Sequence, residues 1–175
     1  EHILSSDFDI AVEKTFNKYN PEVPFFRGDL SSKVTFNQII ESIGDRKIDI
    51  LVGGPPCQGF SMFGKRRFIK SKDHNPLKDN RNDLIFTFLD YVKEISPNWF
   101  MMENVSGLVN LNNGFYLKQF IEKVKSLGYN DFDFKVINTA DYGVPQARKR
   151  FIFIANKTGN IIPWPKPKFY KDPRN

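Results

Sequence analysis

The chain has 175 residues and a net charge of +6. This length is enough for one domain with a packed core, and a hydrophobic fraction of 40% excludes a disordered chain. No apolar run approaches the ~18 residues of a membrane helix, and the start at Glu1 and His2 has no secretory signal, so we expect a cytoplasmic protein with no membrane contact. One cysteine excludes an internal disulfide, and with only two histidines we expect no metal site.

Hydrophobic periodicity along the chain predicts alternating helices and strands. Apolar residues three or four apart indicate helices, and near-continuous apolar runs indicate buried strands. Thr35 and Gln38 fit a capping box at the start of one helix, while Gly44 and Gly128 fit helix ends. In chain order we expect a strand at 3–7, helices at 8–19 and 36–43, a strand at 48–52, a helix at 84–95, a strand at 99–102, a helix at 117–127, and strands at 132–136 and 151–155.

This alternation predicts an α/β fold with a mostly parallel sheet and with ligands at the carboxyl ends of its strands. The 18 phenylalanines predict aromatic packing in its core. The segment 163–167 contains three prolines, which exclude a regular helix or a central strand. We therefore expect a catalytic domain over residues 1–162 and an exit linker over residues 163–175.

The single cysteine lies in an informative setting, Gly53-Gly54-Pro55-Pro56-Cys57-Gln58-Gly59-Phe60-Ser61. A lone cysteine is usually a small core residue. Here it follows a strand and a turn shaped by glycine and proline, which a core residue does not need. The setting favours a nucleophilic thiolate presented to a substrate.

Two more segments carry reactive side chains, Glu103-Asn104-Val105 and Gln146-Ala147-Arg148-Lys149-Arg150. Each is uninformative alone, because a glutamate at a strand end is usually solvated and alternate arginines usually mark an exposed face. Between Lys65 and Arg81 there are also seven lysines or arginines. Such a cluster is usually a surface loop, but it also fits a lid over a nucleic-acid backbone.

Together, these motifs resemble the catalytic signatures of DNA (cytosine-5) methyltransferases over most of the chain, from Leu4 to Ala155. The resemblance implies a Rossmann-like class I methyltransferase sheet with flanking helices. It also implies methyl transfer to C5 of a cytosine flipped out of duplex DNA, with Cys57 adding to C6 and Glu103 hydrogen-bonded to N3. Asn104 then orients the strand-end loop, Arg148 and Arg150 hold the target cytosine, and Gln146 supports that segment.

The cofactor implied by the resemblance is S-adenosylmethionine. Its expected contacts are Asp7 on the ribose, Phe8 on the adenine, Asp29 and Leu30 at the adenine amine and ring, and further contacts from Gly54, Pro56 and Leu84. Asp7 fits a helix N-cap equally well, and Asp29 a turn. The residues expected to contact DNA are Gln58, Ser61, Lys65, Arg66, Arg67 and Gln146.

The chain also departs from the family pattern. A glycine-rich first strand and loop, a target-recognition domain and a returning C-terminal segment are not found, so we expect a fragment that binds the cofactor weakly and is inactive alone. The missing strand predicts a gap in the sheet with exposed apolar edges.

Several functions remain open. The leading one is a DNA methyltransferase, either a solitary enzyme or a member of a bacterial restriction-modification system with a cognate restriction endonuclease as partner. The alternatives are a tRNA cytosine-5 methyltransferase and a non-catalytic nucleic-acid-binding module. A cysteine hydrolase is disfavoured, because only His2 and His74 could assist the thiol.

Overall fold

The computed structural model describes residues 1–56 and 84–169. Contacts between residues divide the chain into two units, Glu1–Lys47 and Ile48–Asn175. The second unit contains the larger sheet and the main core.

The first unit pairs two short parallel strands, β1 (Ser5–Asp7) and β2 (Phe25–Arg27). The helices α1 (Ile10–Tyr19) and α2 (Lys33–Ile43) follow them in turn. β1 and both helices were expected from the sequence, although β1 starts two residues later than predicted. β2 was not expected, because three residues are too few to show a strand period.

Two predicted helix starts in this unit are wrong. The N-cap of α1 is Asp9, whose side chain accepts a hydrogen bond from the amide of Ala11, so Asp7 is not the cap. The helix α2 begins after Ser32, which places Thr35 inside the helix rather than at a capping box. The Thr35 side chain is buried and lies close to Gly28, so it packs inside the unit instead of capping the helix. The expected end of this helix at Gly44 is confirmed.

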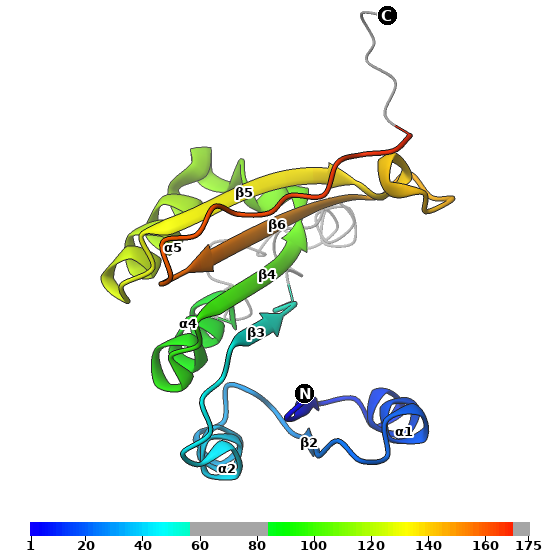
Figure 1. The fold of residues 1–175 in the computed structure, drawn as a ribbon, viewed down its shortest axis with the longest axis vertical. Helices are drawn as coiled ribbons and strands as arrows, with labels where there is room; N and C mark the ends of the chain where they lie inside the picture. Colours follow the sequence, from blue (N-terminus) through cyan, green and yellow to red (C-terminus); the bar gives the residue numbers. More distant parts are fainter. Residues whose placement is uncertain (57–83, 170–175) are drawn as a thin grey trace, which may run out of the picture. The chain divides into compact units, whose positions relative to one another are not determined.

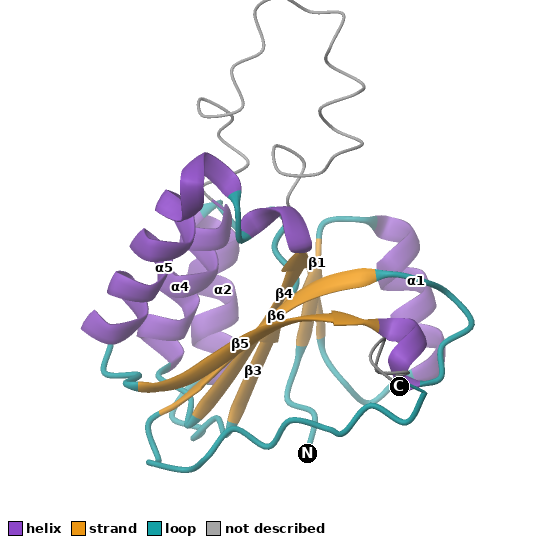
Figure 2. Ribbon diagram, turned by 90° about the horizontal axis from the view of Figure 1, so that it is seen from above, coloured by secondary structure: helices purple, strands orange, loops and turns teal. Residues whose placement is uncertain are grey.

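The second unit contains a four-stranded sheet in the order β3-β4-β6-β5 (Figure 1). The helices α4 and α5 lie on one of its faces (Figure 2). The elements are β3 (Ile50–Gly53), α4 (Leu84–Ile95), β4 (Trp99–Val105), η3 (Ser106–Leu108), η4 (Leu111–Gly114), α5 (Phe115–Ser126), β5 (Asp131–Asn138), η5 (Thr139–Tyr142) and β6 (Lys149–Asn156).

The predicted α/β class is confirmed, but the sheet is not mostly parallel. β3 pairs with β4 in parallel, whereas β6 runs antiparallel to both β4 and β5. The reason is the connection between β5 and β6. It has no crossover helix, and strands joined without a crossover must run in opposite directions.

The core of the second unit is aromatic, as the phenylalanine content predicted. Phe100 and Phe153 stack on neighbouring strands with their ring centroids 5.9 Å apart. The ring of Phe120 from α5 meets Phe153 edge-on at 5.0 Å, and the ring of Tyr129 meets Phe100 edge-on at the same distance. These arrangements are favoured by the ring quadrupoles and make the core specific as well as apolar.

Two apolar side chains of β3, on the face opposite to Leu51, are exposed. Ile50 is 63% exposed and Val52 is 59% exposed. In the described part of the chain β3 pairs only with β4, and β1 and β2 form a separate sheet. This arrangement agrees with the expected exposure of apolar residues at a sheet edge.

Candidate active site

The strand β4 carries two of the predicted site residues on opposite faces. Phe100, Met102 and Asn104 alternate toward the core, so Glu103 lies on the other face. β4 is longer than expected and continues to Val105, so Glu103 and Asn104 are inside the strand rather than after it. The regular backbone of β4 thus determines the direction of the Glu103 carboxylate.

Glu103 is paired with Arg150. The Arg150 Nε lies 2.6 Å from Glu103 Oε1, with 18% of the arginine side chain and 42% of the glutamate side chain exposed. In the β4–β6 ladder Glu103 stands opposite Ile152, so Arg150 is its diagonal neighbour on the same face. The structure therefore brings together two residues that are 47 positions apart in the sequence.

Asn104 connects this strand to the turn after β3. Its side chain is 1% exposed, and Nδ2 donates to the carbonyl of Pro55 at 3.1 Å. Its Oδ1 accepts from the amide of Val105 at 2.9 Å, so both ends of the buried amide are hydrogen-bonded. The turn that leads to Cys57 is thereby held beside β4.

The glycines of this turn allow a close approach. A Cβ at Gly53 would lie 2.4 Å from Cε2 of Phe88, which no side chain could occupy without displacing the ring. A Cβ at Gly54 would instead meet Glu103 Oε2 at 3.6 Å, an ordinary contact distance. Gly54 is therefore next to the Glu103 carboxylate, as expected for neighbouring parallel strands that end at one edge.

The segment with Gln146 and Arg148 forms a hydrogen-bonded loop between β5 and β6. The hydroxyl of Thr139 donates to the carbonyl of Gln146 at 2.8 Å, and its amide donates to the carbonyl of Arg148 at 3.0 Å. The amide of Arg148 donates in turn to Asn138 Oδ1 at 3.0 Å. The side chains of Gln146 and Arg148 are exposed, so the loop is anchored through its backbone and presents both to solvent.

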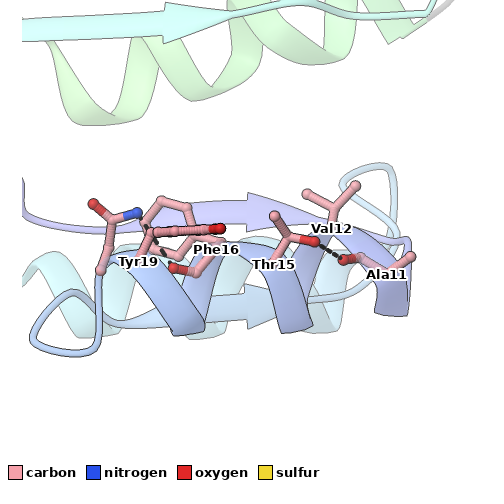
Figure 3. A pocket seen from close by; sticks show the side chains of 6 residues that line it. Ala11, Val12, Thr15, Phe16 and Tyr19 are labelled. Carbon is pink, nitrogen blue, oxygen red and sulfur yellow. Dashed lines mark hydrogen bonds between the residues drawn. The ribbon is translucent and has the colours of Figure 1, made fainter.

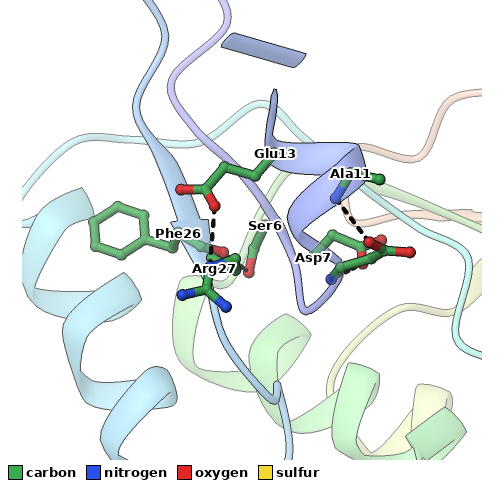
Figure 4. A network of polar contacts seen from close by, with 7 residues as sticks. Ser6, Asp7, Ala11, Glu13, Phe26 and Arg27 are labelled. Atoms are coloured by element: carbon green, nitrogen blue, oxygen red, sulfur yellow. Dashed lines mark hydrogen bonds and ion pairs between the residues drawn. The ribbon is translucent and has the colours of Figure 1, made fainter. Parts of the chain in front are cut away.

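In the first unit, Asp7 and Asp29 lie at the same end of the β1–β2 pair. Asp7 is the last residue of β1 and pairs with Arg27, the last residue of β2. The Asp7 carboxylate accepts from the amide of Asp9 at 2.9 Å (Figure 4). In the same network Arg27 forms an ion pair with Glu13 at 3.0 Å.

Asp29 is held in a local turn, the alternative weighed from the sequence. Its Oδ1 accepts from the hydroxyl and the amide of Ser31 at 2.7 and 2.8 Å. These bonds, the hydroxyl's first, hold the pKa of Asp29 below its usual value of 3.8. A turn residue can still carry a free carboxylate oxygen toward a ligand, so the two roles are compatible.

The other expected cofactor contacts are divided between the units. Phe8 is 72% exposed and Leu30 is 36% exposed in the first unit. Gly54 and Pro56 follow β3, and Leu84 begins α4, in the second unit. Carboxylates at the strand ends can accept hydrogen bonds from hydroxyl and amine groups, and the exposed Phe8 ring offers an apolar surface to a ligand.

A shallow hollow of about 510 Å³ lies elsewhere, along one side of α1 (Figure 3). Its lining comes from this helix and its C-cap residue: Ala11, Val12, Thr15, Phe16, Tyr19 and Asn20. None of the expected cofactor contacts lines it. The hydroxyl of Thr15 and the side-chain amide of Asn20 are bonded to backbone carbonyls of the helix, so the hollow presents mainly apolar surface.

Part of the predicted site lies outside the described residues. This part comprises Cys57, Gln58, Ser61, Lys65, Arg66 and Arg67, together with the rest of the basic cluster. Within the described ranges no three His, Cys, Asp or Glu side chains gather as a metal site, and no helix there is long and apolar enough to cross a membrane.

Sequence reasoning missed the groups that hold the site in place. Neither the carbonyl of Pro55 nor the side chains of Asn138 and Thr139 were expected to take part. The polar pair Asn138 and Thr139 at the start of a turn is a signal that could have predicted their part in holding the loop. A backbone carbonyl has no sequence signal at all.

The geometry defines an α/β protein with a polar site where β3, β4 and β6 approach one another. The family model for C-5 cytosine-specific DNA methylases matches residues 1–175, so the chain belongs to this family.

The chain is similar to the Type II methyltransferase M1.HphI of Haemophilus parahaemolyticus, with 37% identity over 94% of the chain and 42% of that protein. It is also 35% identical to the Type II methyltransferase M.AquIA of Picosynechococcus, over 95% of the chain and 69% of that protein. A crystal structure titled as a DNA modification methyltransferase of an E. coli prophage superimposes with a TM-score of 0.69 at 27% identity, covering 90% of the chain and 40% of that protein. The chain thus spans less than half of the first and the last of these proteins, and about two thirds of the second.

Proposed function

We propose that the protein of which this chain is the catalytic part transfers a methyl group from S-adenosylmethionine to C5 of cytosine in duplex DNA. The observation that carries the proposal is the Glu103–Arg150 ion pair beside Gly54, at the start of the turn that leads to Cys57. Family membership and the Type II methyltransferase relatives support it.

Each residue of the site has a role in this chemistry. The Cys57 thiolate adds to C6 of a flipped cytosine, and the electron pair of the C5–C6 bond moves toward C5. A proton shared between Glu103 and ring N3 balances the charge that develops on the ring. S-adenosylmethionine, when bound, supplies an electrophilic methyl group. Loss of the C5 proton then expels the thiolate and restores the aromatic ring.

Arg150 would keep the Glu103 carboxylate aimed at the base. The ion pair fixes the position of the carboxylate, which can accept a hydrogen bond from the exocyclic amine of the base. Asn104 would hold the Pro55 carbonyl and hence the start of the nucleophile turn. In this scheme Arg148 and Gln146 contact the cytosine or the DNA backbone from the 139–148 loop.

In the first unit, the methyl donor would be bound by Asp7 at the end of β1 and by Asp29 after β2. Asp7 fits the ribose hydroxyls, and Asp29 fits the adenine amine, because a carboxylate accepts hydrogen bonds from both kinds of group. The basic residues Lys65, Arg66 and Arg67, together with Gln58 and Ser61, would contact DNA. We further propose a cognate restriction endonuclease as partner and a cytoplasmic location with the nucleoid.

The test uses the full-length protein and a duplex carrying 5-fluorocytosine. With S-adenosylmethionine present, a covalent protein–DNA adduct is expected, because fluorine blocks the loss of a C5 proton. Cys57→Ala should abolish the adduct. Glu103→Gln should slow methylation of normal DNA about 10²- to 10⁴-fold, the range for a general acid or base.

The matched control is Glu122→Gln, which removes a carboxylate from the exposed side of α5. It should methylate at the wild-type rate. A wild-type protein that forms no adduct with DNA would refute the proposal. An adduct formed with tRNA in preference to duplex DNA would assign the same chemistry to an RNA substrate.

A further inference from the structure

The chain after β6 is ordered along the sheet rather than loose. Residues 162–169, which we call the strap, run back along β5 toward the loop after it (Figure 1). The prolines at positions 163, 165 and 167 limit its backbone freedom. Most of the strap was expected to belong to an exit linker.

The strap has one anchor on β5. The indole Nε1 of Trp164 donates to Asp133 Oδ2 at 2.7 Å, and the Lys135 ammonium lies 4.8 Å from the centre of the indole ring. Both contacts combine a charged group with the indole, which makes them stronger than neutral ones. Asp133 and Lys135 are two residues apart on a strand, so they lie on one face of the sheet.

That face is the one that carries the candidate site. Across the ladders Lys135 stands opposite Ile152, and Ile152 stands opposite Glu103. Phe132 and Phe134 alternate toward the core on the other face. The Trp164 anchor and the Glu103–Arg150 pair are therefore on the same side of the sheet.

The second anchor is on the loop itself. The amides of Lys168 and Phe169 both donate to the carbonyl of Asp141, at 2.9 and 3.1 Å. The Phe169 ring covers Gly143, where a Cβ would lie 3.0 Å from Cε2. Gly143 has a φ of +95°, a conformation that favours glycine, so this contact depends on a residue without a side chain.

We propose that Trp164 and Phe169 are positioning residues, which clamp the strap to β5 and to the 139–148 loop and so hold Gln146, Arg148 and the Glu103–Arg150 pair in place for methyl transfer. Few hydrogen bonds separate the strap from the site residues. Asp141 lies in η5, whose first residue, Thr139, is bonded to the carbonyls of Gln146 and Arg148. Arg150, the ion-pair partner of Glu103, follows Arg148 by two residues. The inference about methyl transfer rests on the proposed function, whereas the clamping of the loop does not.

The experiment compares full-length wild type with Phe169→Ala, Phe169→Leu and Trp164→Phe. Phe169 is 65% exposed, so its truncation should leave the fold and the melting temperature intact. Trp164→Phe keeps an aromatic ring beside Lys135 but removes the bond to Asp133. The matched control is Ile161→Ala, since Ile161 is 93% exposed and adjoins the strap.

The first readout, amide hydrogen exchange, needs no activity. Exchange of the amides at 139–148 should accelerate severalfold in Phe169→Ala and stay at the wild-type rate in the control. The second readout is the rate of adduct formation on 5-fluorocytosine DNA at saturating DNA. It should fall about ten- to a hundredfold in Phe169→Ala, because small misplacements of reacting groups are costly. Phe169→Leu should restore part of the rate, and Trp164→Phe should give an intermediate loss.

The outcomes separate the two proposals. Wild-type exchange in Phe169→Ala overturns the clamp, whatever the enzyme does. Faster exchange with an unchanged adduct rate overturns the positioning role. A loss of rate that follows the melting temperature, or that the control shares, also overturns it. If the wild-type protein forms no adduct at all, the proposed function fails while the exchange data still decide whether the strap clamps the loop.

Discussion

At the scale of single residues, glycines and short polar side chains allow close contacts between backbone and side chains in this chain. The absence of a side chain at Gly53 lets the Phe88 ring pack against the backbone, and Gly54 lies next to the Glu103 carboxylate. Ser31 holds Asp29 in a turn at the end of β2.

Replacing Gly53 with alanine should destabilise the chain by about 1–3 kcal/mol, the usual cost of overpacking a core. The added Cβ would overlap the Phe88 ring, which is itself packed against Phe100. Chemical denaturation measures the loss. Gly54→Ala is the control, with a loss of less than half as much, and Phe88→Leu should recover part of the loss in the double variant. Equal losses for Gly53→Ala and Gly54→Ala would contradict the packing argument.

Replacing Ser31 with alanine should raise the pKa of Asp29 toward 3.8 without reaching it. The variant loses the hydroxyl bond, which is the larger cause of the lowered pKa, and keeps the amide bond. Because the folded pKa is lowered, the bond stabilises the fold above pH 3.8, and this stabilisation is lost as the pH falls through the folded pKa. Carboxyl NMR titration measures the shift.

Ser32→Ala is the matched control for this titration. Ser32 is the N-cap residue of α2, yet its side chain makes no capping hydrogen bond. The Asp29 pKa should therefore stay at its wild-type value in this variant. An Asp29 pKa that does not change in Ser31→Ala would show that the amide alone holds the carboxylate.

At the scale of elements, the ends of α4 and α5 are joined by Tyr129. Its ring is fully buried, and its hydroxyl donates to the carbonyl of Pro97 at 2.7 Å in the connection between α4 and β4. Burial raises the pKa of Tyr129 to about 12. The Lys157 ammonium, which also bonds the Ser96 hydroxyl, covers the ring at 4.5 Å. One side chain thus ties two helix ends to the sheet.

Replacing Tyr129 with phenylalanine should cost about 1–3 kcal/mol, because the buried Pro97 carbonyl loses its donor. The raised pKa means that the neutral hydroxyl stabilises the fold fully below pH 10, and that this stabilisation is lost between pH 10 and about 12. Across this pH range the free energy of unfolding, measured by chemical denaturation at each pH, should fall more steeply with pH for the wild type than for the variant. The same pH dependence in both proteins would show that another group causes the loss of stability at high pH.

At the scale of the whole chain, the two units have unequal cores. Among the residues that the structure describes, fifteen buried ones form the core cluster of the second unit, from Ile85 to Ala155. In the first unit, α1 has no buried residue, and α2 has three. Because local stability follows buried apolar contact, the units should open independently and at different cost.

Native-state hydrogen exchange on the chain should show this difference. The amides of β4 and β6, in the middle of the sheet, are expected to exchange slowest and to follow global unfolding. The amides of α1 should exchange at least a hundredfold faster, through local opening. Protection of α1 equal to that of β6 would show that the chain unfolds as one cooperative body.

Much of the fold follows from the sequence, because helix and strand periods are local properties. The helix α4 matches the predicted 84–95, and α5 differs from its prediction by two residues at the start. The prediction failed where tertiary contacts outweigh local signals. β2 is too short to show a period, and the apparent capping box at Thr35 lies inside α2 because that side chain packs near Gly28.

The candidate site divides in the same way. The sequence by itself determined the family, since its motifs place particular side chains in a particular order, and the reactive residues that it indicates stay a prediction. Only the tertiary structure decided that Arg150 pairs with Glu103, that Asn104 holds Pro55, and that the strap lies against the loop after β5. The reason is physical: those contacts depend on the register between strands far apart in the chain and on backbone carbonyls, which every residue possesses and no sequence motif can mark.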